Sequence, residues 1–305
     1  MDAWHPDLRA ARFVPTVTWN LPLVGVLRRL PVPRPRVPAG VEVRDVHVPG
    51  PAGAPPVRVR LYRPTHASST PALLWLHGGG YLIGRPEQDD HLCLEFVQRL
   101  GVTVASVDYR IAPEHPFPAA LDDAHATLAW LARPGGGVDV GRIAVGGASA
   151  GGGLAAALAQ RANDDGGPRL AFQLLVYPML DDRTVVREDA APAGLRLWTP
   201  GSNRLGWTAY LGTEPGAATV PAYAAPARRG DLRGLPPAWI GVGTSDLFHD
   251  ENVTYARRLA EAGVPVTLDV VDGAFHGFDA AFRSAHVTRW FVDEQVTALA
   301  AALTG

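Results

Sequence analysis

Seven short apolar runs, rich in β-branched residues, recur along this chain with helical stretches between them, and this alternation limits the folds that it can adopt. The expected strands are residues 57–63, 72–77, 102–109, 142–147, 172–178, 238–243 and 266–272. Helical spacing of apolar residues marks 90–101, 120–132, 149–162 and 250–263. Because strands that alternate with helices pair in parallel, the sequence predicts an α/β fold with a mostly parallel central sheet flanked by helices.

Two segments interrupt this alternation. The first is the Pro-rich start, residues 1 to about 40, and the second runs from 180 to about 225 with several Gly, Pro and aromatic residues. Long interruptions of a regular alternation are typical of lids and binding elements. No linker or internal repeat divides the chain, so we expect a single domain, 1–305, in which 1–40 and 180–225 form a helical cap.

Composition excludes several classes of protein. A net charge of -2, with 19% charged and 47% hydrophobic residues, is that of an ordinary globule and predicts no nucleic-acid partner. The single cysteine, Cys93, excludes an internal disulfide and a Cys-based metal site. The N-terminus lacks the order of a secretory signal, and the apolar stretch 16–27 is too short for a membrane span. We therefore expect a cytoplasmic protein.

The segment GGASAGGG, residues 146–153, contains one hydroxyl group among glycines and alanines. Gly147 to Gly151 satisfy the pattern G-x-S-x-G, directly after an expected strand and directly before an expected helix. A nucleophile elbow needs this context, because strand and helix backbones come close and leave room only for small side chains. The alternative is a plain Gly-rich turn. The strand-turn-helix context favours Ser149 as a nucleophile.

The segment HGGGY, residues 77–81, follows the expected strand 72–77 and precedes an expected helix. Three consecutive glycines expose backbone N–H groups, which suits stabilisation of negative charge on an oxygen atom. A phosphate-binding loop is the alternative, but the lysine of that pattern is absent from this chain. We interpret 77–81 as an oxyanion loop.

A serine nucleophile needs a general base, and His276 is the best candidate among the histidines. It follows the strand 266–272 near the C-terminus, which agrees with the chain order serine, acid, histidine in this type of enzyme. His77 is the alternative, but it precedes Ser149 and is better explained as a brace for its own loop.

The acid that orients the base is expected in GVGTSDLFHDEN, residues 241–252. Asp246 comes first after the strand end and is our candidate, with Asp250 as the second choice. Asp250 and Glu251 read better as the start of the next helix, where negative charge is favourable. Asp272 is close to His276 in sequence, but it is assigned to the preceding strand.

Five segments in this order resemble the bacterial hormone-sensitive-lipase-like esterases, an α/β-hydrolase family marked by HGGG. They are HGGGY, DYRIAPEHPFPAALDD (108–123), GASAGGG, GTSDLFHDE and FHGF. The resemblance extends from about residue 40 to the end and is weakest in the expected cap. It implies a triad of Ser149, Asp246 and His276, and an oxyanion hole formed by the N–H groups of Gly78, Gly79 and Ala150.

Segment 108–123 adds no catalytic group. We interpret Tyr109, Arg110 and Glu114 as a hydrogen-bonded brace. Two positions depart from the family pattern: Ala148 stands where many members have an acidic residue, and Leu247 stands where many have proline. These departures leave the triad intact and leave the subfamily open.

The resemblance implies hydrolysis of short- to medium-chain acyl esters without a metal or an organic cofactor, by a monomer or a homodimer. A non-catalytic small-ligand receptor on the same fold is the alternative from another class, and an amidase, a carbamate hydrolase or a lyase could use the same triad. Apolar and aromatic residues near the motifs or in the cap are candidates for a substrate pocket, although core packing would also explain them: Tyr81, Trp198, Trp207, Tyr210, Leu247 and Phe278.

Overall fold

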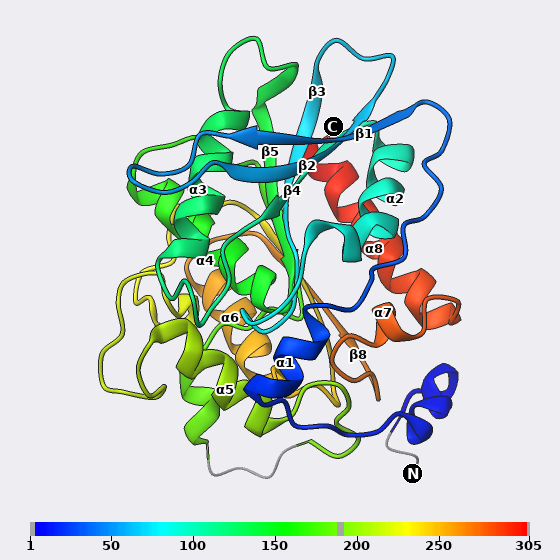
Figure 1. Cartoon of the computed structure of the whole chain (residues 1–305), viewed down its shortest axis with the longest axis vertical. Helices are drawn as coiled ribbons and strands as arrows, with labels where there is room; N and C mark the ends of the chain where they lie inside the picture. The colour runs from blue at the N-terminus through cyan, green and yellow to red at the C-terminus, as the bar shows by residue number, and fades with distance from the viewer. Residues whose placement is uncertain (1–3, 188–191, 304–305) are drawn as a thin grey trace.

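An eight-stranded sheet forms the centre of the computed structural model, which describes residues 4–187 and 192–303 (Figure 1). The strands are β1 (Val41–Val48), β2 (Val57–Pro64), β3 (Thr70–Leu76), β4 (Thr103–Asp108), β5 (Val138–Ala148), β6 (Phe172–Val176), β7 (Ala238–Gly243) and β8 (Val266–Val271). They lie in the order β1-β2-β4-β3-β5-β6-β7-β8. The six strands β4, β3, β5, β6, β7 and β8 pair with one another in parallel, and β2 pairs antiparallel with both β1 and β4.

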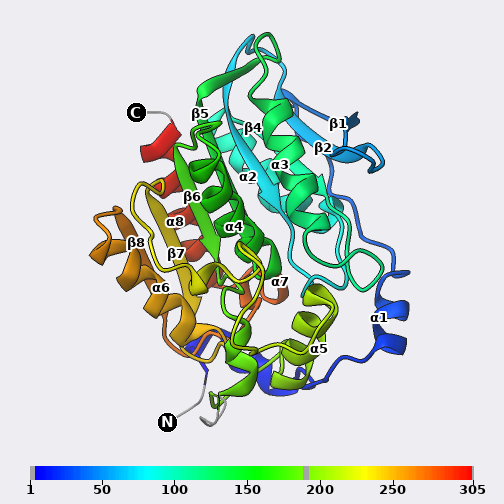
Figure 2. The same ribbon diagram turned by 90° about the vertical axis from the view of Figure 1, so that its left-hand side faces the viewer.

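Helices cover both faces of this sheet (Figure 2). The α-helices are α1 (Leu21–Leu27), α2 (Asp90–Leu100), α3 (Ala119–Leu131), α4 (Ala150–Asp164), α5 (Pro200–Leu211), α6 (His249–Glu261), α7 (Phe278–Ala281) and α8 (His286–Leu303). Short 3-10 helices are Pro6–Phe13, Pro86–Asp89, Asp182–Val186 and Pro226–Arg228. The expected α/β fold with a mostly parallel sheet is confirmed.

Alternate residues of the central strands supply the two halves of the core. In β3, Leu74 and Leu76 pack in a cluster with α3, α4 and α6, whereas Leu73 and Trp75 pack with α2 and α8. Side chains of a strand alternate between the faces of a sheet, so burial on both faces requires the nearly continuous apolar runs seen in the sequence.

All seven expected strands are present, and the main differences lie at the ends of the chain. Strand β1, whose residues are mostly exposed or half-buried at the sheet edge, and the C-terminal helix α8 were not predicted from the sequence. Helix α8 packs Phe291 and Leu299 into the core beside α2. In the residues described, every helix is too short or too polar to cross a membrane.

The two segments that interrupt the alternation contact each other, although they lie far apart in the sequence. The hydroxyl groups of Thr18 and Thr199 are 3.0 Å apart, and the Trp19 N–H donates to Ser202 Oγ over 2.9 Å. Arg196 Nε donates to the Ala11 carbonyl over 2.9 Å. Helices α1 and α5, which belong to these segments, lie together at one end of the sheet (Figures 1 and 2). Residues 188–191 of the second segment lie outside the described residues.

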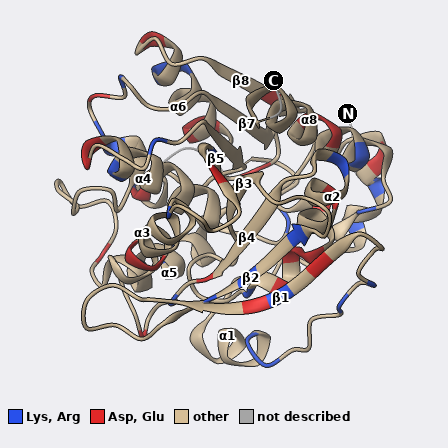
Figure 3. Ribbon diagram, turned by 90° about the horizontal axis from the view of Figure 1, so that it is seen from above, with Lys and Arg blue, Asp and Glu red and all other residues tan. Residues whose placement is uncertain are grey.

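Basic and acidic positions are interspersed along the ribbon in Figure 3, in keeping with the net charge of -2.

Candidate active site

A sharp turn between β5 and α4 carries Ser149. Its φ of 57° lies in the left-handed region, a conformation that costs a non-glycine residue about 1–3 kcal/mol and marks functional sites. Small neighbours are required here: a Cβ at Gly147 would lie 2.4 Å from the Gly151 carbonyl oxygen, and one at Gly151 would lie 2.0 Å from that of Leu76. Strand, turn and helix therefore meet at this point with space for backbone alone.

Ser149, His276 and Asp246 form a continuous chain of hydrogen bonds. His276 Nε2 is 2.8 Å from Ser149 Oγ, and His276 Nδ1 is 2.8 Å from Asp246 Oδ2. All three side chains are buried, and Asp246 is fully enclosed. Because a carboxylate only accepts hydrogen bonds, Nδ1 carries the proton, which leaves Nε2 free to accept from the serine hydroxyl.

The strand ends bring these residues together. Ser149 follows β5, Asp246 follows β7 and His276 follows β8, three strands that point the same way in the sheet. The carboxyl ends of parallel strands lie at one edge, so residues distant in sequence converge there. Asp246 Oδ1 also accepts the Phe248 N–H over 2.9 Å, which fixes the carboxylate plane toward His276.

The other candidate acids point elsewhere. Asp250 is exposed on α6 and pairs with Arg187 over 2.5 Å and with His249 over 2.7 Å. Asp272, one residue beyond β8, accepts from Thr244 Oγ1 over 3.1 Å. The structure places Asp246 alone among these acids against the His276 ring.

Glu251 lies in a different environment from Asp250 and Asp272. It is buried in the first turn of α6 and accepts the N–H groups of Leu180 and Asp181 over 2.6 and 3.2 Å and the Thr184 hydroxyl. Burial raises the pKa of Glu251 to about 8, despite these donors. It ties α6 to the segment that follows β6.

His77 braces the HGGGY loop. Its Nδ1 lies 2.9 Å from the Gly78 carbonyl oxygen, its ring stacks on Tyr109 at 4.2 Å, and the Tyr109 hydroxyl donates to the His77 carbonyl over 2.6 Å. Burial lowers the pKa of His77 to about 4, so the ring is neutral at physiological pH. The expected brace in segment 108–123 also includes an ion pair of Arg110 with Asp123 and one of Glu114 with Arg28, at 2.8 and 2.7 Å.

The backbone of the HGGGY loop lies against the elbow. A Cβ at Gly78 would be 3.1 Å from the Ala148 carbonyl oxygen and 3.5 Å from Ser149 Cβ. Gly79 has a φ of 128°, and its Cβ would lie 2.1 Å from the Ile83 carbonyl oxygen. Ala150 is the first residue of α4, where a backbone N–H has no partner inside the helix. Gly78 and the N-terminus of α4 thus lie beside the serine.

Trp198 links the covering segments to this loop. A Cβ at Gly80 would lie 2.1 Å from Trp198 Cη2, and the indole ring is 6.3 Å from the His276 ring, centroid to centroid. Trp198 Nε1 donates to Asn203 Oδ1 over 3.3 Å, and Trp19 packs edge-on against the indole at 5.1 Å. Trp198 was a predicted pocket residue, whereas its neighbour Trp19 was not predicted from the sequence.

The remaining pocket candidates separate into three environments. Tyr81 stacks on Tyr210 at 3.8 Å, and Trp207 packs against both rings in a buried aromatic cluster. Phe278 is fully buried against Phe291 of α8, at 5.0 Å between ring centroids. Leu247 is half-buried and packs against the core on the α3 and α4 face.

Two residues beside His276 were missed by the sequence analysis. The Tyr177 ring lies edge-on to the imidazole at 4.8 Å, and the Phe248 ring does so at 5.1 Å, both between ring centroids. Tyr177 directly follows β6 and has a φ of 34°. Its position directly after a parallel strand could have identified it, because Ser149, Asp246 and His276 also follow parallel strands.

Comparison with known proteins agrees with this geometry. The family model described as alpha/beta hydrolase fold matches residues 73–280. Esterase LipI of Mycobacterium tuberculosis is 40% identical over 254 residues, covering 80% of this chain and 78% of the relative. Carboxylesterase NlhH of the same species is 37% identical over 268 residues, covering 83% of this chain and 80% of the relative. The chain belongs to the hormone-sensitive-lipase-like esterases of the α/β-hydrolase fold.

Solved structures extend the similarity of this esterase to the whole described chain. A bacterial heroin esterase superposes with a TM-score of 0.88 and 38% identity, covering 99% of this chain and 98% of the other. Esterase LipW from Mycobacterium marinum superposes with a TM-score of 0.86 and 34% identity, covering 99% and 96%. The resemblance inferred from five motifs is confirmed. Within residues 4–187 and 192–303, no group of three or more His, Cys, Asp or Glu side chains could hold a metal ion.

Proposed function

We propose that this esterase hydrolyses short- to medium-chain carboxylic esters through an acyl-enzyme on Ser149. The observation that carries the proposal is the pair of 2.8 Å contacts that joins Ser149 Oγ to His276 and His276 to Asp246. The relatives and solved structures described above are named esterases, which supports the same substrate class here.

In the first half-reaction, Ser149 Oγ attacks the ester carbonyl carbon while His276 Nε2 takes the hydroxyl proton. Asp246 stabilises the imidazolium and keeps the proton on Nδ1. The tetrahedral oxyanion is bound by the N–H groups of Gly78, Gly79 and Ala150, and one such donor is worth about 3 kcal/mol in a comparable hole. His276 then protonates the leaving alcohol, and the acyl group stays on Ser149.

The second half-reaction releases the acid. A water molecule gives its proton to His276 and attacks the acyl carbon, and the oxyanion passes through the same backbone donors. Collapse of this intermediate returns the proton to Ser149 Oγ and frees the carboxylic acid. The residues involved supply the acid, base and nucleophile that this chemistry requires.

The two covering segments, 1–40 and 180–225, form the cap in this proposal. Trp198 stands between the HGGGY loop and His276 and is held by Trp19 from the other segment. A large, fixed ring at this position limits the length of the acyl or alcohol group. Tyr81 and Trp207 belong to the same buried cluster as Trp198. A cytoplasmic location and a monomeric or homodimeric state stay predictions.

The test is a series of p-nitrophenyl esters from acetate to dodecanoate, with fluorophosphonate labelling of the wild type and Ser149→Ala. We expect kcat/KM to be highest for chains of about four to eight carbons and at least tenfold lower for dodecanoate, as a pocket of fixed size requires. Labelling should be lost in Ser149→Ala.

Three outcomes would contradict the proposal in different ways. Fluorophosphonate labelling of the Ser149→Ala variant would show that Ser149 is not the nucleophile. Absence of both labelling and turnover for every ester would favour a ligand receptor on the same fold. Faster cleavage of p-nitroanilides or carbamates than of matched esters would favour an amidase or a carbamate hydrolase.

A further inference from the structure

A hydrogen bond outside the triad joins the loops that carry Ser149 and His276. The hydroxyl of Tyr177, which directly follows β6, donates to Asp279 Oδ1 over 2.8 Å. Asp279 lies in the first turn of α7, three residues after His276. The bond therefore connects the segment after β6 with the segment after β8, which carries the proposed general base.

The Tyr177 end of this bond is fixed to the elbow. The Ser149 N–H donates to the Val176 carbonyl over 2.9 Å, and the Met179 N–H donates to the Ser149 carbonyl over 3.0 Å. Tyr177 lies between these two residues in the chain, and its own N–H donates to the Gly241 carbonyl over 2.7 Å. Its φ of 34° is a left-handed conformation, which persists in a bulky residue only where the surroundings hold it. Tyr177 is thus held at a defined place relative to Ser149.

The Asp279 end is fixed to the loop of His276. Gly277 precedes α7 in the left-handed conformation, with a φ of 70°, and turns the chain directly after the histidine. Phe278 follows and is fully buried against Phe291 of α8, with 5.0 Å between the ring centroids. Asp279 comes next, so its carboxylate and the imidazole belong to one anchored turn.

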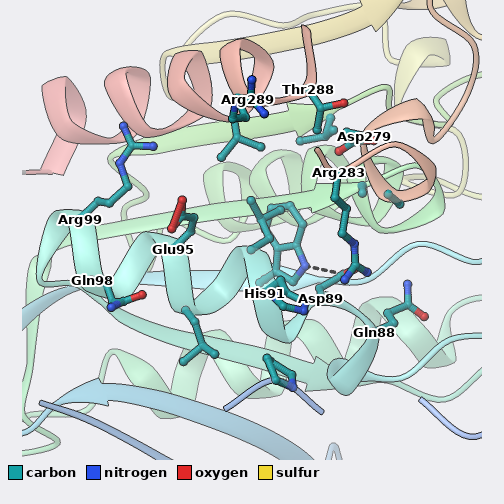
Figure 4. A pocket seen from close by; sticks show the side chains of 18 of the residues that line it. Gln88, Asp89, His91, Glu95, Gln98, Arg99, Asp279, Arg283, Thr288 and Arg289 are labelled. Carbon is teal, nitrogen blue, oxygen red and sulfur yellow. Dashed lines mark hydrogen bonds between the residues drawn. The ribbon is translucent and has the colours of Figure 1, made fainter. Parts of the chain in front are cut away.

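A cavity of about 580 Å³ between α2 and α8 borders this bond, and Figure 4 shows Asp279 at its side. Tyr177 and Asp279 both line the cavity, and Ala148 lines it from the elbow. The side chain of Ala148 is a methyl group, which cannot form a hydrogen bond to α7. On the side that faces the cavity, the bond from Tyr177 to Asp279 therefore supplies a polar link that Ala148 cannot provide.

The Tyr177 ring also packs on the base itself. It lies edge-on to the His276 imidazole, with 4.8 Å between ring centroids and an interplanar angle of 65°. Burial raises the pKa of Tyr177 well above its usual value, and the charge of Asp279 adds to this rise. The hydroxyl therefore keeps its proton and is the donor in the bond to Asp279. The ring of this side chain contacts the imidazole while its hydroxyl is anchored.

We propose that Tyr177 and Asp279 are positioning residues, which together hold the His276 imidazole against the nucleophile. This inference rests on the proposed function, in which His276 Nε2 takes the proton of Ser149 Oγ across the observed 2.8 Å. A misplacement of about 1 Å in a reacting group can lower a rate by about 100-fold. Loss of the link should therefore slow attack by the serine and leave substrate binding unchanged.

The test compares Tyr177→Phe, which keeps the ring and removes the donor, with Asp279→Ala, which removes the acceptor. Each should lower kcat for p-nitrophenyl butyrate about tenfold with KM within about twofold, and should slow fluorophosphonate labelling by the same factor. Asp279→Asn keeps an oxygen that accepts from Tyr177, so its kcat should be within about threefold of the wild type. The combined Tyr177→Phe and Asp279→Ala variant should also be about tenfold slower, because both changes remove one bond.

Tyr255→Phe is the matched control. Gln160 Nε2 donates to the buried Tyr255 hydroxyl over 3.1 Å, and Gln160 lies ten residues along α4 from Ala150, a distance of about 15 Å. This variant also loses a buried tyrosine hydroxyl, but its kcat should stay within about twofold of the wild type.

The extent of labelling separates positioning from folding. A variant that is labelled completely, but slowly, is folded and has a misplaced base, which supports the proposal. Incomplete labelling at the wild-type rate in both Tyr177→Phe and Asp279→Ala would show a purely structural role and overturn it, as would a kcat of Tyr177→Phe within about twofold of the wild type or a hundredfold loss in the combined variant. If the wild type itself were not labelled, the proposed function would fail first, and this role with it.

Discussion

The loops at the sheet edge and the segments that cover them are built in different ways. Ser149, Asp246 and His276 each follow a parallel strand, and the sheet alone brings them within hydrogen-bond distance. Trp19 and Trp198 belong to no strand, and they meet through contacts between segments about 180 residues apart. The proposed catalytic groups are therefore positioned by strand ends, whereas the covering segments are held by packing between distant side chains.

The largest expected effect tests whether the edge loops alone carry the chemistry. Asp246→Asn should lower kcat for p-nitrophenyl butyrate by about 10⁴-fold, because the imidazole loses its acceptor and its correct tautomer. Asp250→Asn is the matched control and should stay within about twofold, since Asp250 is exposed and bonds to Arg187 and His249. If the two variants exchanged these effects, the acid would have to be reassigned.

A second prediction concerns the backbone donors. Gly79→Ala should lower kcat by about 10² to 10³-fold, because a Cβ 2.1 Å from the Ile83 carbonyl oxygen must displace the loop. Gly230→Ala serves as the control, since its Cβ would enter open space. Steady-state kinetics on p-nitrophenyl butyrate measures both variants. An unchanged kcat in Gly79→Ala would exclude this part of the loop from the oxyanion hole.

The third prediction concerns the covering segments. Trp198→Leu should raise the ratio of kcat/KM for octanoate over butyrate by roughly tenfold, because a smaller side chain opens space for additional methylene groups. Trp290→Leu, at a 37% exposed position on α8, should leave the ratio unchanged. A fall in kcat for every chain length, with a constant ratio, would show that Trp198 supports the oxyanion loop and does not select substrates.

The smallest effect concerns Glu251, which joins α6 to the segment after β6. Its folded pKa is about 8, well above the usual value, so the native state holds a proton that the unfolded chain releases at lower pH. The free energy of unfolding should therefore fall as pH rises from about 5 to about 8. Urea titrations should show this loss in the wild type relative to Glu251→Gln, by more than about 1 kcal/mol. A constant difference across this range would refute the raised pKa.

Much of the structure at the carboxyl edge of the sheet could be predicted from the sequence, because the motifs that indicate it are local. Gly147 to Gly151 require a close approach of strand and helix, and the positions of Asp246 and His276 follow from the strand ends before them. The fold class follows from the same alternation. Strand β1 and helix α8 were not expected, since β1 is largely exposed at the sheet edge and α8 lies beyond the last crossover.

The covering segments, 1–40 and 180–225, could be predicted only as interruptions of the alternation of strands and helices. Nothing near Trp19 in sequence shows that it packs on Trp198, because that contact depends on the path of the whole chain. Tyr177 was missed although it directly follows β6, at the edge of the sheet where Ser149, Asp246 and His276 also lie.

The bond from the Trp19 N–H to Ser202 Oγ has a consequence for the order of synthesis. Residues are added from the N-terminus, so Trp19 leaves the ribosome about 180 residues before its partner does. Until then Trp19 lacks both the Ser202 hydroxyl and the Trp198 ring that it contacts in the folded chain. The wall beside His276 can therefore form only after residue 202 has been translated, later than the turn at Ser149.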